Sequence, residues 1–224
     1  MTRRFDVTDP SDRTTAVKAA VTSARHGRLV LLPTESVYAL LTDAFAPSGV
    51  RALRALKGRP HDAPLPIAVG SVAMLAGVAD RLSASGQALV EAFWPGPLTL
   101  VCRQHPSLAW SVGGGLALTV RMPLHPLALE VIRAVGPCVL LGADPPLDVD
   151  PTGLPAPGVD VVLEAGRLPG PCLPSSVVDL RSTPAVLRRR GALSEDRLTA
   201  VVPDLQVPDR TREVTAASSP GPAT

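Results

Sequence analysis

The sequence contains few of the residues and motifs that mark several common classes of protein. Aromatic side chains make up 3% of the 224 residues, which leaves little material for the base-stacking platforms of RRM-like or OB-like RNA-binding domains. The three cysteines form no CxxC motif and the four histidines no HExxH motif, so neither a disulfide framework nor a structural zinc site is supported. The absence of a GxxxxGKS/T loop, of GxGxxG after a strand and of a GxSxG elbow disfavours P-loop, Rossmann and α/β-hydrolase sites.

Long apolar runs are absent as well. The apolar stretches are only a few residues long, such as residues 29–32, whereas a membrane-spanning helix needs roughly 20. The N-terminus is polar and contains no apolar signal-peptide core. With 46% hydrophobic and 19% charged residues, the chain can build a core. These features predict a soluble, cytoplasmic α/β or α+β protein with no membrane partner and no protein-bound metal.

The basic residues are unevenly divided between lysine and arginine. Lysine occurs only at Lys18 and Lys57, and the other 20 of the 22 basic residues are arginine. The formal net charge of +2 is too small to indicate a nucleic-acid partner by itself. A lysine at a position where this chain would ordinarily have arginine favours a chemical role for Lys57.

The periodicity of apolar residues predicts a chain of mixed helices and strands. Helical spacing and capping residues predict helices over 11–26, 47–56, 71–79, 83–93, 126–135 and 194–201. Short apolar runs predict strands over 28–32, 65–69, 98–102, 116–121, 138–141, 159–163, 176–180 and 185–189. Because the elements do not alternate strictly, we expect a twisted mixed sheet in one domain over 1–202. A polar tail without periodicity follows over 203–224 and is predicted to be disordered.

The first polar cluster that could carry chemistry is Pro33-Thr34-Glu35-Ser36-Val37-Tyr38. It follows a predicted buried strand and places two hydroxyl groups and a carboxylate at the strand end. Ligands often dock at strand ends in α/β sheets. The alternative is that these hydroxyl groups cap the next segment.

The second cluster is Lys57-Gly58-Arg59-Pro60, which follows a predicted helix. A lysine point charge and an arginine fork on either side of a glycine suit a polyphosphate. The alternative is a helix C-terminus, where a glycine cap and cations are common.

Two further clusters end or begin predicted strands. Arg121 ends the strand over 116–121, where it could hold a carboxylate with two hydrogen bonds or form a structural ion pair. Ser175 and Ser176 begin another strand, and the stretch Leu187-Arg188-Arg189-Arg190-Gly191 follows it. This pair of stretches could bind an anion or form a turn beside a solvated basic face. The triple glycine over 113–115 is interpreted as a plain loop.

In this order, the clusters resemble the YrdC-like family of threonylcarbamoyl-AMP synthases. The resemblance extends from about Gly27 to Gly191. It rests on PTESVYAL at 33–40, KGRP at 57–60, FWPGPLTLV at 93–101, TVRMPLHP at 119–126, SSVVDL at 175–180 and LRRRG at 187–191. The FWPGPLTL stretch and the ordered series are specific, whereas each short motif alone is not.

The resemblance implies a twisted mixed α/β sheet flanked by helices around a concave basic cavity. It also implies a nucleotidyltransferase that condenses L-threonine, bicarbonate or carbon dioxide, and ATP with Mg²⁺ into threonylcarbamoyl-AMP and pyrophosphate. The product would serve the threonylcarbamoylation of adenosine 37 in tRNA through downstream transfer proteins. Carried over by motif position, Thr34, Ser36, Arg121 and Ser175 would bind threonine. Lys57, Arg59, Asp144 and Arg189 would bind ATP, with Lys57 and Arg59 also catalytic.

Several positions depart from the family pattern. Gly142-Ala143-Asp144 stands where relatives have Ser-Ala-Asn, so a hydroxyl is lost and a carboxylate lies near the expected phosphates, which it repels unless Mg²⁺ bridges it. Ala63 and Ala68 replace an asparagine and a histidine on the substrate side. These changes motivate a second hypothesis, a paralogue that binds nucleotide, tRNA or double-stranded RNA without catalysis. A third hypothesis is a carbamoyl-adenylate reaction on another substrate.

Overall fold

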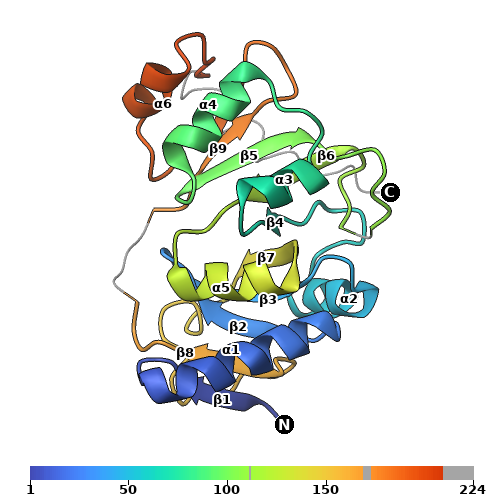
Figure 1. Cartoon of the computed structure of the whole chain (residues 1–224), viewed down its shortest axis with the longest axis vertical. Helices are drawn as coiled ribbons and strands as arrows, with labels where there is room; N and C mark the ends of the chain where they lie inside the picture. The colour runs from blue at the N-terminus through green and yellow to red at the C-terminus, as the bar shows by residue number, and fades with distance from the viewer. Residues whose placement is uncertain (111, 169–172, 209–224) are drawn as a thin grey trace, which may run out of the picture.

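The structure, a computed structural model of the chain, describes residues 1–110, 112–168 and 173–208 (Figure 1). These residues form six helices: α1 (Pro10–Arg25), α2 (Pro47–Leu56), α3 (Val72–Val78), α4 (Ala84–Phe93), α5 (Pro126–Val135) and α6 (Glu195–Val201). All six agree with the predicted helices to within one residue at each end. Among them, none combines the length and the apolar character that crossing a bilayer requires.

The helix starts follow from local chemistry. Proline occupies the first turn of α1, α2 and α5, where its missing N–H costs no hydrogen bond. The side chains of Ser71, Ser83 and Ser194 accept backbone N–H groups at the starts of α3, α4 and α6. These signals lie within a few residues of each helix, so the sequence predicts them well.

The described residues also form ten strands in one sheet. The strands are β1 (Arg3–Asp6), β2 (Val30–Pro33), β3 (Tyr38–Asp43), β4 (Ile67–Ala68), β5 (Leu98–Arg103), β6 (Ala117–Arg121), β7 (Cys138–Gly142), β8 (Val161–Glu164), β9 (Ser176–Asp179) and β10 (Val186–Arg189). Their order is β1-β8-β2-β3-β7-β4-β6-β5-β9-β10, and the sheet contains both parallel and antiparallel pairs. The predicted mixed sheet is therefore confirmed.

Two strands were not expected from the sequence. Strand β1 is partly exposed and begins with two arginines, so it shows no apolar alternation. It forms because it pairs in parallel with β8, more than 150 residues later. Strand β3 lies between β2 and β7 and is buried on both faces over most of its length, so it too lacks a period of two.

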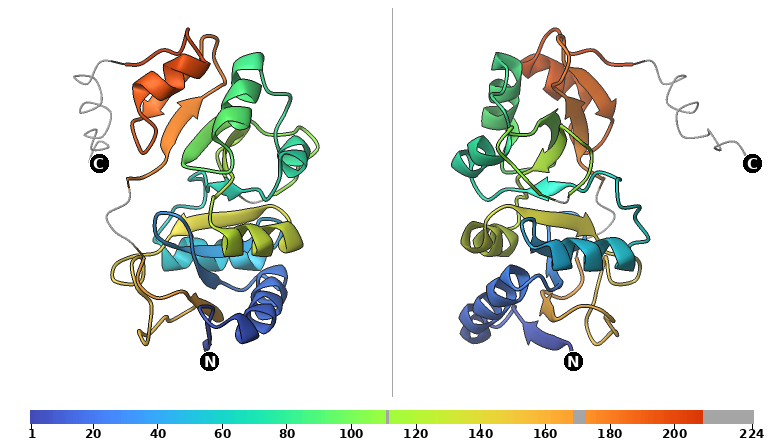
Figure 2. Two further views of the ribbon diagram at one scale, coloured as in Figure 1. Left: turned by 60° about the vertical axis from the view of Figure 1, so that its left-hand side comes forward. Right: turned by 90° about the vertical axis from the view of Figure 1, so that its right-hand side faces the viewer.

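Helices cover both faces of the sheet. Helices α1 and α5 lie side by side over one face of the β8-β2-β3-β7 region, as Figure 2 shows. Ala20 of α1 and Ile132 of α5 are fully buried there. A second and larger apolar cluster contains residues of α2, α3, α4 and α6.

The packed part of the chain extends beyond residue 202, the boundary expected for the disordered tail. Leu205 is buried in the larger apolar cluster. The Gln206 N–H donates to the Ala185 carbonyl at 2.9 Å, and the Leu187 N–H donates to the Gln206 carbonyl at 2.8 Å. Tertiary pairing thus orders residues 203–208, which have no helical or strand period. Residues 209–224 of the expected tail lie outside the described residues.

The sheet register brings separate motifs together. Strand β5 pairs with β6 on one side and with β9 on the other. Thr99 of β5 therefore stands opposite Arg121 of β6 and opposite Val177 of β9. Since Ser175 directly precedes β9, the carboxyl end of β6 and the start of β9 meet at one edge of the sheet.

Candidate functional site

A cavity of about 310 Å³ lies where these strand ends meet. Its lining includes Arg59, Arg121, Ser175 and Arg189, which come from four separate predicted motifs. A larger hollow of about 470 Å³ lies beside α3 and α4, but none of the predicted site residues lines it. We therefore place the candidate site in the first cavity, where three guanidinium groups can face an anionic ligand.

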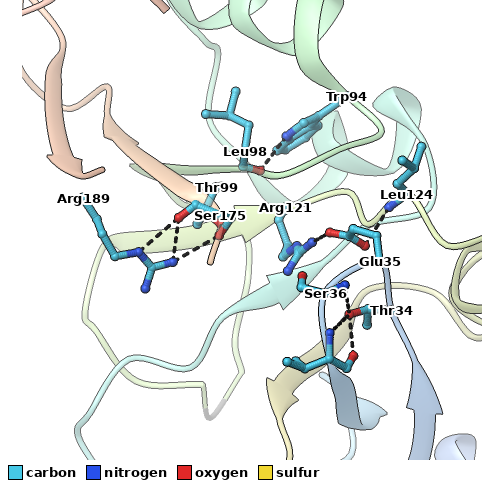
Figure 3. A network of polar contacts seen from close by, with 11 residues as sticks. Thr34, Glu35, Ser36, Trp94, Leu98, Thr99, Arg121, Leu124, Ser175 and Arg189 are labelled. Atoms are coloured by element: carbon cyan, nitrogen blue, oxygen red, sulfur yellow. Dashed lines mark hydrogen bonds and ion pairs between the residues drawn. The ribbon is translucent and has the colours of Figure 1, made fainter. Parts of the chain in front are cut away.

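Arg121 is the most deeply buried of these cations. Its Nη2 pairs with Oε1 of Glu35, and Oε2 of Glu35 accepts the backbone N–H of Leu124 at 3.1 Å (Figure 3). Burial, and to a lesser extent the nearby charge of Arg189, lower the Arg121 pKa to about 10. Arg121 remains charged at neutral pH, and its charge is poorly hydrated. A carboxylate that enters the cavity would therefore form strong charge-assisted hydrogen bonds with it.

Ser175 and Arg189 form a second polar group in the same cavity. The Arg189 Nη2 donates to the Ser175 carbonyl at 2.8 Å and contacts the Ser175 hydroxyl at 3.1 Å. The Ser175 hydroxyl is also 2.8 Å from the Thr99 hydroxyl (Figure 3). Burial lowers the Arg189 pKa. The predicted association of the SSVVDL and LRRRG stretches is therefore present, with Thr99 as an additional member.

The close approach of these two stretches depends on Gly191. A Cβ atom at this position would lie 2.3 Å from the Pro174 carbonyl oxygen and 2.5 Å from the Ser176 nitrogen. No side chain fits at such distances from backbone atoms, so glycine at 191 lets Arg189 reach Ser175.

Thr34 and Ser36 lie in the turn between β2 and β3. The Thr34 hydroxyl donates to the Val37 carbonyl at 2.6 Å and accepts the backbone N–H groups of Ser36 and Val37 at 3.3 Å. Thr34 is 2% exposed, and its hydroxyl closes the turn. The role of Thr34 in binding threonine stays a prediction beside this local capping. Ser36 is partly exposed and lies near Arg121 (Figure 3).

Lys57 and Asp144, both expected near ATP, form an ion pair with each other. Lys57 is the C-cap residue of helix α2, and its Nζ pairs with Oδ1 of Asp144. The Lys57 side chain is 11% exposed, whereas that of Asp144 is 71% exposed. The carboxylate that replaces the family asparagine therefore contacts the lysine that is expected to hold phosphate.

The loop that carries Lys57 and Arg59 is held by Arg54, a residue that the sequence analysis missed. The Arg54 Nη1 donates to the carbonyls of Pro60 at 2.5 Å and Ala63 at 2.8 Å. Arg54 is 5% exposed, and burial lowers its pKa. Nothing in the local sequence distinguishes this arginine from an exposed helical one, because its partners are backbone carbonyls of a loop.

The triple glycine braces the same loop. The Gly114 N–H donates to the Asp62 carbonyl at 3.2 Å. Gly113 has a φ of +75°, and a Cβ there would lie 2.6 Å from the Ala63 carbonyl oxygen. This packing agrees with the interpretation of residues 113–115 as a structural loop.

The departures at residues 63, 68 and 142 affect the site differently. Ala68 is buried within β4, and Ala63 accepts from Arg54 through its carbonyl. Gly142 lines the cavity, and a Cβ added there would meet only Val37, at an ordinary 3.5 Å. A Cβ atom would therefore fit at 142. Among the described residues, no group of three or more histidine, cysteine, aspartate or glutamate side chains could hold a metal ion.

Comparisons with known proteins confirm the resemblance seen in the motifs. The Sua5/YciO/YrdC family model, described as "Telomere recombination", matches residues 23–191. A Mycobacterium tuberculosis relative named "Putative threonylcarbamoyl-AMP synthase" is 39% identical over 210 residues, which cover 90% of this chain and 96% of the relative. The Pyrococcus abyssi threonylcarbamoyl-AMP synthase is 30% identical over 92% of this chain and 63% of its own length.

Solved structures agree with the sequence relatives. The crystal structure of Pyrococcus abyssi Sua5 complexed with L-threonine superposes with a TM-score of 0.81 and 27% identity, over all of this chain and 65% of that chain. Escherichia coli YciO, at 18% identity and a TM-score of 0.75, shares the fold over 88% of this chain.

Proposed function

The chain belongs to the Sua5/YciO/YrdC family, and on that premise we propose that it is a threonylcarbamoyl-AMP synthase. It joins L-threonine, bicarbonate and ATP into threonylcarbamoyl-AMP and releases pyrophosphate and water. The observation that carries the proposal is the convergence of Arg59, Arg121, Ser175 and Arg189 on one cavity. A paralogue that only binds nucleotide or RNA is not favoured, because the relatives that match nine-tenths of this chain are named as synthases.

Arg121 supplies the threonine end of the proposed site. A guanidinium group binds a carboxylate through parallel N–H donors, and burial strengthens this pairing. The hydroxyl groups of Ser36, Thr99 and Ser175 lie around Arg121 and can accept from or donate to the polar groups of the amino acid (Figure 3). Threonine is therefore held by one charge and several neutral hydrogen-bonding groups.

Lys57, Arg59 and Arg189 supply the phosphate end. Lys57 offers a point charge, and the two arginines offer planar forks. Arg59 and Arg189 line the same cavity as Arg121, so phosphates held there lie beside the amino acid. Asp144 also lies at the phosphate end, because its carboxylate forms an ion pair with Lys57. Phosphates that bind Lys57 take the place of this carboxylate. Mg²⁺ enters with ATP as part of the substrate.

The reaction requires positioning and charge compensation rather than a covalent enzyme intermediate. The threonine amine first bonds to the carbon of carbon dioxide and loses a proton, or bonds to the carbon of bicarbonate with loss of water, and either route gives a carbamate. A carbamate oxygen then bonds to the α-phosphorus of ATP while the bond to pyrophosphate breaks. Fixed cations offset the charge that builds up in the transition state. Of the cysteines that the structure describes, burial raises the pKa of Cys102 to about 12 and that of Cys138 well above its usual range, so neither supplies a thiolate nucleophile.

The test is an assay of the full chain with L-threonine, bicarbonate, ATP and Mg²⁺. We expect threonylcarbamoyl-AMP and pyrophosphate to form together, and product to disappear when any one substrate is omitted. Arg121→Gln and Arg59→Gln should each abolish most of the product, whereas Arg103→Gln, an exposed arginine outside the cavity, should not. Failure of the folded wild-type chain to form product would overturn the proposal.

We also propose the setting of this reaction. The product is a mixed anhydride that water destroys, so a transfer protein that modifies adenosine 37 of tRNA must consume it promptly. Since ATP, tRNA and such transfer proteins are found together in the cytoplasm, the chain acts there. Adding transfer proteins and unmodified tRNA to the assay should yield threonylcarbamoylated tRNA.

A further inference from the structure

The carboxylate of Glu35 contacts the arginine at the threonine end of the cavity. The side chains of Glu35 and Arg121 are 16% and 15% exposed, so both charges are largely removed from water. A buried charge is stable only when its partner stays in place. The second Glu35 oxygen accepts the Leu124 N–H at 3.1 Å, which anchors the carboxylate to the backbone independently of Arg121.

The contact uses only part of the Arg121 guanidinium group. Figure 3 shows one terminal nitrogen directed at Glu35 and another directed away from it. The Nε atom is buried and has no hydrogen-bond partner among the described residues. Because a guanidinium group has five N–H donors, Arg121 retains donors for one further planar anion.

The surrounding charges also affect how Arg121 is held. Arg121 and Arg189 line the same cavity and repel each other. Without Glu35, the buried Arg121 charge would lack both a counter-ion and water, and Arg189 would repel it. Both effects would favour movement of the guanidinium group out of the cavity. The turn that presents Glu35 is itself fixed by Thr34, whose hydroxyl makes three hydrogen bonds within residues 34–37.

We infer that Glu35 is a positioning residue that fixes the Arg121 guanidinium group and thereby makes the pocket selective for amino acids with a free carboxylate. This inference deepens the proposed function and rests on it for the identity of the substrate. The alternative is that Glu35 competes with the substrate carboxylate for Arg121. The backbone anchor at Leu124 favours positioning, because it keeps Glu35 on one side of the guanidinium group while other donors remain available.

The test compares the binding of L-threonine and L-threoninamide, which lacks the carboxylate charge, by calorimetric titration of the full chain without ATP. The wild-type chain should bind threonine at least about tenfold more tightly than the amide. Glu35→Gln keeps the side-chain volume but removes the charge, so threonine affinity should fall while threoninamide affinity stays the same. The ratio of the two affinities should then approach one. Glu91→Gln, an exposed glutamate on α4, is the matched control and should keep the wild-type ratio.

Two results would overturn the inference. Tighter threonine binding by Glu35→Gln would mean that Glu35 competes with the substrate, and an unchanged ratio would mean that it does not position Arg121. If thermal melting shows that Glu35→Gln is unfolded, Glu35→Asp replaces it. Its side chain is one methylene shorter and cannot reach both Arg121 and Leu124, so the ratio should fall at least about threefold, and an unchanged ratio again overturns the inference. Turnover does not enter these ratios, so an inactive wild-type chain would refute the proposed function separately.

Discussion

The ion pair between Lys57 and Asp144 leads to a prediction about ATP affinity. Asp144→Asn removes the carboxylate charge and restores the residue that the family pattern has at this position. Because Asp144 is 71% exposed, solvent screens the pair, which is then worth about 0.2–1 kcal/mol. Phosphates must break this pair to reach Lys57. The substitution should therefore tighten MgATP binding by the same free energy, which corresponds to about 1.4- to 5-fold in Kd.

Calorimetric titration of MgATP into the wild-type and variant chains measures this change. The gain should shrink between about 0.05 M and about 0.5 M salt, since screening weakens the pair that the substitution removes. Asp12→Asn, at an exposed position in the first turn of α1, removes an equivalent charge far from Lys57 and should leave the Kd unchanged. Weaker MgATP binding by Asp144→Asn would refute the reasoning, because the carboxylate would then contribute to binding, as expected if Mg²⁺ bridged it to the phosphates.

Three further substitutions test other parts of the structure. Lys57→Ala should lower kcat/KM for ATP at least about tenfold while changing the free energy of unfolding by no more than about 1 kcal/mol. A loss of activity matched by an equal loss in the free energy of unfolding would indicate a structural role for Lys57 instead. Gly191→Ala places a Cβ 2.3 Å from the Pro174 carbonyl oxygen. The free energy of unfolding measured in urea should therefore fall by about 1–3 kcal/mol, and threonine should bind more weakly. Wild-type values for both measurements would show that the backbone shifts to make room for the methyl group. Hydrogen bonds and charge from Arg181, opposed by burial, lower the Asp179 pKa from 3.8 to about 2. The ionised Asp179 carboxylate therefore stabilises the fold above pH 3.8, and this stabilisation is lost as the pH falls toward 2. Asp179→Asn should therefore cost about 1–2 kcal/mol near neutral pH, reduced by screening at its half-exposed arginine partners, and a gap from wild type that persists at about pH 2 would contradict this.

The helices could be predicted because their signals are local. Helix α5 begins at Pro126 and is followed by Gly136, and the predicted range over 126–135 is the observed one. Strands depend on distant partners, which a local pattern does not contain. Strand β3 is buried on both faces between β2 and β7, so it lacks the alternation that identifies a half-exposed strand.

The same distinction applies to the site. Arg59, Arg121, Ser175 and Arg189 belong to motifs that the sequence shows directly, and they meet at one cavity. Thr99 was missed because a single hydroxyl within an apolar strand is ordinary, and only the pairing of β5 with β6 and β9 places it against Ser175. A hydroxyl after a strand suits both a ligand and a turn. The Thr34 hydroxyl makes contacts within the turn, and its role in binding threonine stays a prediction.

Neighbouring residues in the sequence therefore have different tasks in this cavity. Thr34 closes a turn, the adjacent Glu35 contacts Arg121, and the next residue, Ser36, lies beside the same arginine. Likewise, Gly191 provides the space that Arg189 needs to reach Ser175. Each of these motifs is thus a set of contacts that hold a cation in place, together with the few groups that face the ligand. For this reason a substitution at a supporting position can change ligand selectivity without removing any ligand contact.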